Sequence, residues 1–235
     1  MNIKHGQIWQ LGCQRLACGD CFDDKLIEQL LDGADINCII YDPPWHIKSA
    51  MQKPKIVENV DNLLAFTDGM YAKKVIGLFG SPSWIFGWDC CTNWRVNKQL
   101  PFKQQKLCFW YGDLKSYNVN GAYYGQGDAD KNQFYNPQNR GKHLSDLYRE
   151  PIIKLHQDHQ HSHTKPLNWI RMLIGNCSSG EVLDLFGGSG STLIACEQLQ
   201  RFSYTVEIEP EFCADIIKRW QDFTCKQAFL INPTQ

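Results

Sequence analysis

The residues of this sequence best suited to chemistry are Asp42, Pro43, Pro44 and Trp45, which directly follow the apolar run 36–41. Two prolines cannot donate to a sheet ladder, so they end the strand that this run predicts and hold their carbonyl groups at nearly fixed angles. The Asp42 carboxylate and the Pro43 carbonyl can together accept both hydrogens of an exocyclic amine, while Trp45 stacks on the ring that carries the amine. A proline-terminated strand with a capping Asp and a surface Trp is the simpler alternative, and these four residues alone do not separate the two.

A second candidate site is a glycine-rich turn between the apolar run 181–186 and a helical pattern at 193–199. Glycines let the backbone approach a ligand, and the start of a helix offers free N–H groups, as in nucleotide-type cofactor sites. Glu207 follows about twenty residues later, at the end of the next predicted strand, where a carboxylate can accept from both hydroxyls of a ribose. The candidate cofactor residues of the turn are Asp184, Phe186, Gly187, Gly188, Ser189, Gly190 and Thr192.

Together these motifs resemble the DNA amino-methyltransferases, which transfer a methyl group from S-adenosylmethionine to an exocyclic base nitrogen. The resemblance covers most of the chain: the tetrapeptide 42–45 matches the catalytic motif of the family, and residues 184–192 match its cofactor loop. Residues 163–167 (HTKPL) match the segment before that loop, and residues 201–212 match the stretch after it. The catalytic motif precedes the cofactor loop, as in the permuted group called the beta class.

The resemblance also implies roles for two further residues and shows two departures. Lys165, in the segment before the loop, is implied as a cofactor residue, and Asp20 as the acid that meets the adenine amino group of the cofactor. For Asp20 the alternative is a helix N-cap formed by Asp20 or Asp23. The departures are Leu185, where the family more often has proline, and residues 204–206 (YTV), where a Gly-Ile or Gly-Val pair is commoner. Neither touches the chemistry.

The elements that must position these residues alternate between strand and helix patterns. We expect a single doubly wound α/β domain over residues 1–235, with a mostly parallel sheet of the Rossmann-like methyltransferase type. The pattern predicts strands at 15–19, 36–41, 75–79, 106–111, 181–186 and 204–208, and helices at 22–31, 60–74, 168–174 and 193–199, with a further helix starting near 83. A loop at 46–59 is expected to be mobile and to close on DNA or on the flipped base, although an ordinary surface loop fits it equally well.

Composition and charge are consistent with a nucleic-acid enzyme. Residues 45–180 carry 17 basic and 10 acidic side chains, whereas residues 1–44 carry 3 against 7 and residues 181–235 carry 4 against 8. A basic middle on an acidic cofactor core suits a phosphate-facing surface. Eleven cysteines, an odd number, favour reduced and packed thiols. Without an apolar run of eighteen residues or a signal peptide, we expect a cytoplasmic protein of bacterial or phage origin with no membrane partner.

The resemblance to the permuted family implies that the interval 112–161 is a small inserted target-recognition region. Its Asn and Gln side chains can read adenine edges, and its basic residues can contact phosphates. DNA is the expected partner, and a homodimer is left open. The four histidines at 156, 159, 161 and 163 are irregularly spaced with no cysteine pair nearby, so no metal site is predicted. The candidate DNA-contacting residues are Lys48, Lys53, Lys55, Arg140, Lys142 and Arg149.

The sequence therefore predicts an adenine-N6 DNA methyltransferase that uses S-adenosylmethionine, flips its target base and has short or loose site specificity. Adenine is favoured because Asp is commoner than Ser at this motif in adenine enzymes. Cytosine-N4 methylation is the alternative within the class. A non-catalytic DNA-binding or cofactor-binding module is the alternative outside it.

Overall fold

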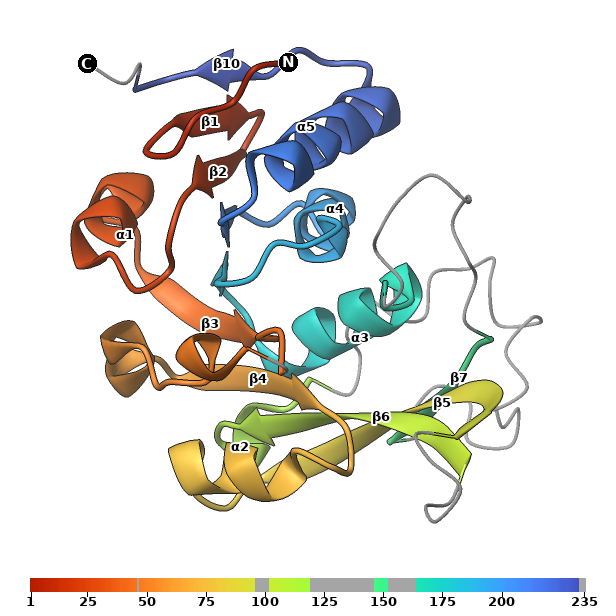
Figure 1. Ribbon diagram of the computed structural model, residues 1–235. Coiled ribbons are helices and arrows are strands. Elements are labelled where there is room, and N and C mark those ends of the chain that lie inside the picture. Colours follow the sequence, from red (N-terminus) through yellow and green to blue (C-terminus); the bar gives the residue numbers. More distant parts are fainter. Residues whose placement is uncertain (46, 96–101, 119–145, 152–163, 233–235) are drawn as a thin grey trace.

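The computed structural model of this chain describes residues 1–45, 47–95, 102–118, 146–151 and 164–232. Within these residues ten strands form one sheet, in the order β10-β1-β2-β9-β8-β3-β4-β6-β5-β7 (Figure 1). In chain order the strands are β1 (Ile8–Leu11), β2 (Gln14–Cys18), β3 (Ile36–Tyr41), β4 (Asn62–Thr67), β5 (Trp84–Arg95), β6 (Phe102–Tyr111), β7 (Leu147–Arg149), β8 (Glu181–Asp184), β9 (Ser203–Glu207) and β10 (Phe229–Leu230).

Five neighbouring strands, β2, β9, β8, β3 and β4, run parallel and form the centre of the sheet. Antiparallel strands β1 and β6 extend this centre on its two sides. The helices are α1 (Asp24–Leu31), α2 (Ala72–Phe79), α3 (Leu167–Cys177), α4 (Ser191–Gln198) and α5 (Pro210–Thr224). This is the doubly wound α/β fold that the sequence predicts.

Helices cover both faces of the sheet, α1 and α2 on one face and α3, α4 and α5 on the other (Figure 1). Strand β3 shows why, because its side chains alternate between two apolar clusters. Cys38 and Ile40 join the cluster that contains α3 and α4, whereas Ile39 and Tyr41 join the cluster that contains α1 and α2. A strand buried on both faces reads as a nearly continuous apolar run, as 36–41 does apart from Asn37.

The segment 60–91 differs from its predicted elements. The expected helix at 60–74 is wrong, because Asn62–Thr67 forms strand β4 between β3 and β6, with every residue buried. The expected strand at 75–79 is wrong as well, since it belongs to helix α2, in which only Val75 is fully buried. The expected helix near 83 is strand β5, where Phe86, Trp88 and Cys90 are buried at a period of two. Short apolar runs do not distinguish a buried strand from a helix by themselves.

The described part of the loop at 46–59 contains two short 3₁₀ turns, at Lys48–Ala50 and Lys55–Asn59. It is tied to the core, because the Tyr41 hydroxyl donates to the carbonyl of Gln52 at 2.8 Å and Val57 is buried. Its closure on DNA stays a prediction. The ten cysteines whose side chains are described are free thiols. No described helix is long and apolar enough to cross a membrane.

Candidate active site

The two motifs meet at one edge of the sheet, where the parallel strands end. Asp42 follows β3, Asp184 ends β8 and Glu207 ends β9, so their carboxylates lie at the carboxyl ends of neighbouring strands. Open α/β sheets bind their ligands at such an edge. A cavity of about 880 Å³ runs along this edge, and every candidate catalytic and cofactor residue except Gly190 lines it.

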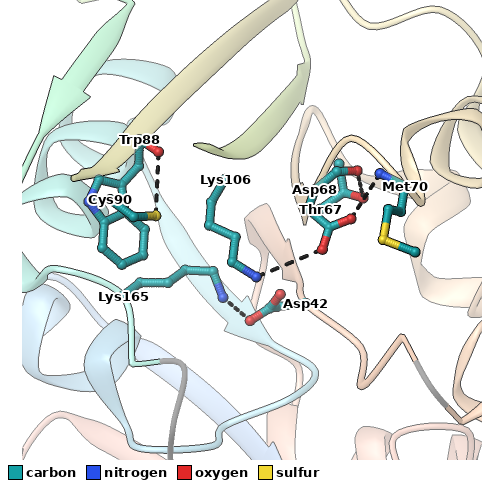
Figure 2. A network of polar contacts seen from close by, with 8 residues as sticks. All are labelled: Asp42, Thr67, Asp68, Met70, Trp88, Cys90, Lys106 and Lys165. Atoms are coloured by element: carbon teal, nitrogen blue, oxygen red, sulfur yellow. Dashed lines mark hydrogen bonds and ion pairs between the residues drawn. The ribbon is translucent and has the colours of Figure 1, made fainter. Parts of the chain in front are cut away.

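The turn after β3 supplies the middle of the cavity. The Asp42 side chain is about one-third exposed and forms an ion pair with Lys165 (Figure 2). The carbonyl of Pro44 accepts a hydrogen bond from the backbone N–H of Ile47 at 2.8 Å, which fixes the path of the chain after the prolines. The acceptors of the turn are thereby held in a rigid backbone next to the cavity.

Trp45 belongs to an aromatic pair that the sequence does not reveal. Its ring stacks on Tyr71, with the ring centres 5.5 Å apart and the planes inclined by 17°. Tyr41 packs edge to face against Trp45, with the ring centres 6.2 Å apart. Tyr71 lies just before α2 and also lines the cavity. Because the two rings stack on each other, a flat ring that enters the cavity can lie on an outer face of this pair but not between its members.

The glycine-rich turn forms the other end of the cavity and is built for close approach. Gly188 and Gly190 have φ values of 51° and 73°, a region that side chains with a Cβ rarely adopt. A Cβ on Gly187 would come within 2.7 Å of the Thr205 side chain. Arg219 of α5 donates to the carbonyl of Ser189 at 2.6 Å and so anchors the turn. No local motif indicates Arg219.

Glu207 is bonded to this turn. Its carboxylate accepts from the backbone N–H of Gly188 at 2.6 Å and from that of Glu209 at 2.9 Å. Burial raises the pKa of Glu207, and these hydrogen bonds oppose the shift. The carboxylate lines the cavity with acceptor capacity for a diol.

Asp184 is the most strongly perturbed acid of the site. Burial raises its pKa to about 7, against hydrogen bonds from the Thr192 side chain and the Phe186 backbone. Strongly shifted acids inside a cavity are typical of functional sites. Asp184 also accepts the Phe186 N–H at 3.0 Å, which starts the turn.

Asp20 and Lys165 are the two residues for which the family resemblance implies cofactor contacts. Asp20 lines the cavity and accepts from the backbone N–H of Phe22 at 3.0 Å, while the N-cap of α1 is Asp23. Lys165 also lines the cavity, but its ammonium pairs with Asp42 and lies 4.8 Å from the centre of the Phe66 ring. Lys165 is also close enough to Asp184 to lower the pKa of that acid, so it lies between the catalytic turn and the cofactor end of the cavity.

Two further charged residues, Asp68 and Lys106, line the cavity beyond the catalytic turn. The sequence does not single out Asp68, whereas Lys106 begins the segment 106–111, which resembles the family segment that helps wall the target-base pocket. Asp68 follows β4, and its carboxylate lies 3.9 Å from the ammonium of Lys106 on β6 (Figure 2). Phe66 and Trp88 line the same end of the cavity. Strand pairing brings Asp68, Lys106 and Trp88 together, because β6 pairs with β4 on one side and with β5 on the other.

The candidate DNA residues are only partly placed. Lys53 pairs with Glu58 at 3.5 Å, Lys55 with Asp24, and Arg149 with Asp89 at 2.8 Å. Arg140 and Lys142 lie outside the described residues, as do most of the interval 112–161 and all four clustered histidines; the Lys48 side chain is not described either. DNA contact by these residues stays a prediction.

Comparison with known proteins identifies a matching family and solved structures with the same fold. A family model for DNA methylases of the N6/N4 methyltransferase type matches residues 92–219. No curated protein matches the sequence. Among solved structures, M1.HpyAVI in complex with SAM is 17% identical, with 88% of this chain and 99% of that chain covered at a TM-score of 0.60.

Two other solved structures share the fold at similar distance. The cytosine-N4-specific PvuII DNA methyltransferase is 14% identical, with 86% of this chain and 84% of that chain covered at a TM-score of 0.56. TTHA0409 from Thermus thermophilus, complexed with S-adenosyl-L-methionine, is 15% identical, with 94% of this chain and 99% of that chain covered at a TM-score of 0.55. At these identities the likeness shows the fold, a Rossmann-like α/β sheet.

Proposed function

The chain belongs to the N6/N4 family of DNA methylases, and we propose that it transfers a methyl group from S-adenosylmethionine to the N6 amino group of adenine in DNA. The observation that carries the proposal is a continuous cavity that joins two sets of groups. One set, at Asp42 and Trp45, suits an amino-bearing base, and the other, at Gly188 and Glu207, suits a nucleoside cofactor.

The cofactor end fits S-adenosylmethionine in its chemistry. The glycine turn offers a close backbone approach, Glu207 offers acceptors for the ribose hydroxyls, and Asp20 offers one for the adenine amino group. A cation beside Asp184 favours its ionised form, so Asp184 can pair with the cofactor's ammonium, and Lys165 can pair with its carboxylate. When bound, the cofactor supplies an electrophilic methyl group on a sulfonium.

The catalytic turn prepares the base. An adenine inside a duplex is out of reach, so it must leave the stack and enter the cavity, where Trp45 and Tyr71 provide flat surfaces. Its amino lone pair is delocalised into the ring and is a poor nucleophile. Asp42 and the Pro43 carbonyl accept the two amino hydrogens and favour a more pyramidal nitrogen. Much of the rate then comes from positioning.

Asp42 does not have to act as a strong base. The methylated amine is acidic before it loses its proton, and a nearby carboxylate stabilises the positive charge that develops there. Lys165 holds Asp42 by an ion pair and rests on Phe66, so the carboxylate cannot rotate freely before the base arrives. Lys165 in this way serves both the catalytic turn and the cofactor end.

Cytosine-N4 methylation is the second candidate, because the PvuII DNA methyltransferase with the same fold is cytosine-N4-specific. Both bases present an amine beside a ring nitrogen, so the catalytic turn accommodates either. We propose residues 112–161 as the region that reads the DNA, and the permuted beta-class order as the arrangement of the motifs.

The test is methyl transfer to unmodified plasmid DNA with labelled S-adenosylmethionine, followed by nucleoside mass spectrometry and base-resolution modification sequencing. We expect N6-methyladenine at a short or loosely defined site and no product from Asp42→Ala. N4-methylcytosine alone would reverse the choice of base. Cofactor binding without transfer to any DNA would favour a non-catalytic module.

A further inference from the structure

From the structure we infer that Lys106 and Asp68 read the ring of the target base, with Lys106 donating to the ring nitrogen beside the amino group and Asp68 holding the ammonium in place. This inference rests on the proposed function, since it requires a flipped base in the cavity. It adds a specificity-determining pair to the catalytic turn.

The first argument is the position of Lys106 in its strand. Along β6 the side chains of Cys108 and Trp110 point into the core and are buried, and alternation puts Lys106 on the same face. Its cross-strand partner on β5 is the buried Trp88. An apolar residue would continue the core at this point, but the chain has a lysine whose side chain is only 21% exposed.

The second argument is the carboxylate that faces Lys106. Asp68 is 4% exposed, and its other oxygen accepts from the backbone N–H of Met70 at 3.0 Å, which fixes its orientation. Burying an ion pair costs desolvation that a packed apolar pair would avoid, so such a pair adds little to stability. Charged groups in a cavity are instead typical of ligand recognition.

The third argument is where the pair lies. In the sheet, β4 and β6 lie on the other side of β3 from β8, so Asp68 and Lys106 lie beyond Asp42 from the glycine turn. Phe66, Tyr71 and Trp88, from β4, the segment after it and β5, line the same cavity. Figure 2 shows Lys106 reaching from its strand toward Asp68, with Lys165 reaching toward Asp42 beside it. A base whose amine meets Asp42 would place its ring among these aromatic and charged groups.

The chemistry of the bases explains what such a pair would select. Adenine and cytosine each have an unprotonated ring nitrogen next to the amino-bearing carbon, which accepts a hydrogen bond from an ammonium. Guanine and thymine have an N–H next to their carbonyl on that edge, so an ammonium there would face a donor. At 3.9 Å the Asp68 contact is coulombic, and it orients Lys106 without a direct hydrogen bond.

The experiment combines a protein change with a change of one base atom. Duplexes carrying the mapped target would contain adenine, 1-deazaadenine, which lacks the ring nitrogen, or 7-deazaadenine as a control for analogue effects. Methyl transfer would be measured as kcat/KM for the parent, Lys106→Met, Lys106→Gln and Asp68→Asn. Lys74→Met, an exposed change on the neighbouring α2, is the matched control.

We expect Lys106→Met to lower kcat/KM on adenine by about 10- to 100-fold, the usual effect of losing a charge-assisted hydrogen bond. On 1-deazaadenine the parent and Lys106→Met should differ by less than about 3-fold, whereas on 7-deazaadenine the full loss should persist. Lys106→Gln should lose less of its kcat/KM on adenine, because it keeps a hydrogen-bond donor. The loss in Asp68→Asn should depend on the ring nitrogen in the same way as the loss in Lys106→Met. Lys74→Met should behave like the parent.

If Lys106→Met and Asp68→Asn each lose the same factor in kcat/KM on all three duplexes, the inference is overturned. The effect of a merely structural pair would not depend on the ring nitrogen. That result would leave the proposed function intact, since the parent would still methylate. A parent that transfers no methyl group to any DNA would overturn both. Thermal unfolding and cofactor affinity of each variant separate loss of folding from loss of recognition, and Lys106→Gln keeps the test decisive if Lys106→Met is unfolded.

Discussion

At the scale of single residues, Asp42 has the clearest separable role. It lies between the two ends of the cavity, and the group that it contacts is Lys165 rather than the glycine turn. Asp42→Asn keeps the shape but loses the charge and one acceptor. We expect methyl transfer to fall by roughly 100-fold or more, with cofactor affinity within a few-fold of the parent. Calorimetry with S-adenosylmethionine beside a transfer assay measures both, and a matching loss of cofactor affinity would show that the turn serves the cofactor instead.

The raised pKa of Asp184 predicts that the stability of the folded chain depends on pH. Burial raises the pKa of Asp184 to about 7 in the folded protein, from 3.8 for the unperturbed acid. Between these values the folded chain binds the proton that the unfolded chain has lost, so this group's contribution to stability falls as the pH rises from about 4 to 7. Asp184→Asn cannot ionise. Its stability relative to the parent should therefore increase from pH 5 to pH 8.

Urea unfolding of the parent and Asp184→Asn at pH 5, 6, 7 and 8 checks this prediction. Asp35→Asn, at an exposed position, reports any general effect of removing a carboxylate. A stability difference that stays constant over this range would contradict a raised pKa at Asp184.

At the scale of elements, the end of β9 holds the glycine turn that leads into α4. Glu207 ends β9 and holds the N–H of Gly188 at 2.6 Å, so the strand fixes the turn that leads into the helix. Glu207→Gln replaces a charged acceptor and weakens this contact. We expect S-adenosylmethionine affinity to fall by about 10-fold or more, from the cost of disturbing a charged hydrogen bond.

Titration calorimetry measures the affinity of Glu207→Gln, with Glu211→Gln as the matched control on the exposed first turn of α5. If Glu207→Gln binds the cofactor like the parent, Glu207 supports the turn without touching a ligand.

Elements also show what the sequence can and cannot predict. The strand 36–41 and the turn 184–192 were predictable because prolines and glycines mark where the strands end and because the runs 36–41 and 181–186 are mostly apolar. Strand β4 and helix α2 were predicted with their types exchanged, since short apolar runs fit either structure. Asp68, Tyr71 and Arg219 belong to no local motif. They reach the cavity only through strand register and helix packing, which depend on contacts distant in sequence.

At the scale of the whole molecule, charge is divided between the basic middle of the chain and its acidic ends. If the interval 112–161 binds DNA, neutralising Arg140 and Lys142 should weaken binding about equally for all sequences and reduce its salt dependence, because phosphate contacts release counterions. Fluorescence anisotropy over a salt series measures this. Lys218→Gln, on the acidic cofactor side, is the control. An unchanged salt slope would place the DNA surface elsewhere.

The strand order interleaves early and late parts of the chain, with β9 and β8 lying between β2 and β3. If the chain were cut between residues 119 and 145, the first piece would keep β1 to β6 but would have a gap two strands wide at its centre. The second piece would keep β8 and β9, which would pair with each other but would lack their outer parallel neighbours, β2 and β3. Each piece alone should therefore be unfolded and inactive.

Mixing the two pieces should restore methyl transfer at a rate that depends on the product of their concentrations. Such complementation would make this fold a two-part reporter, in which activity measures how closely any two fused proteins meet. Activity in either piece alone would show that the sheet does not need its interleaved centre.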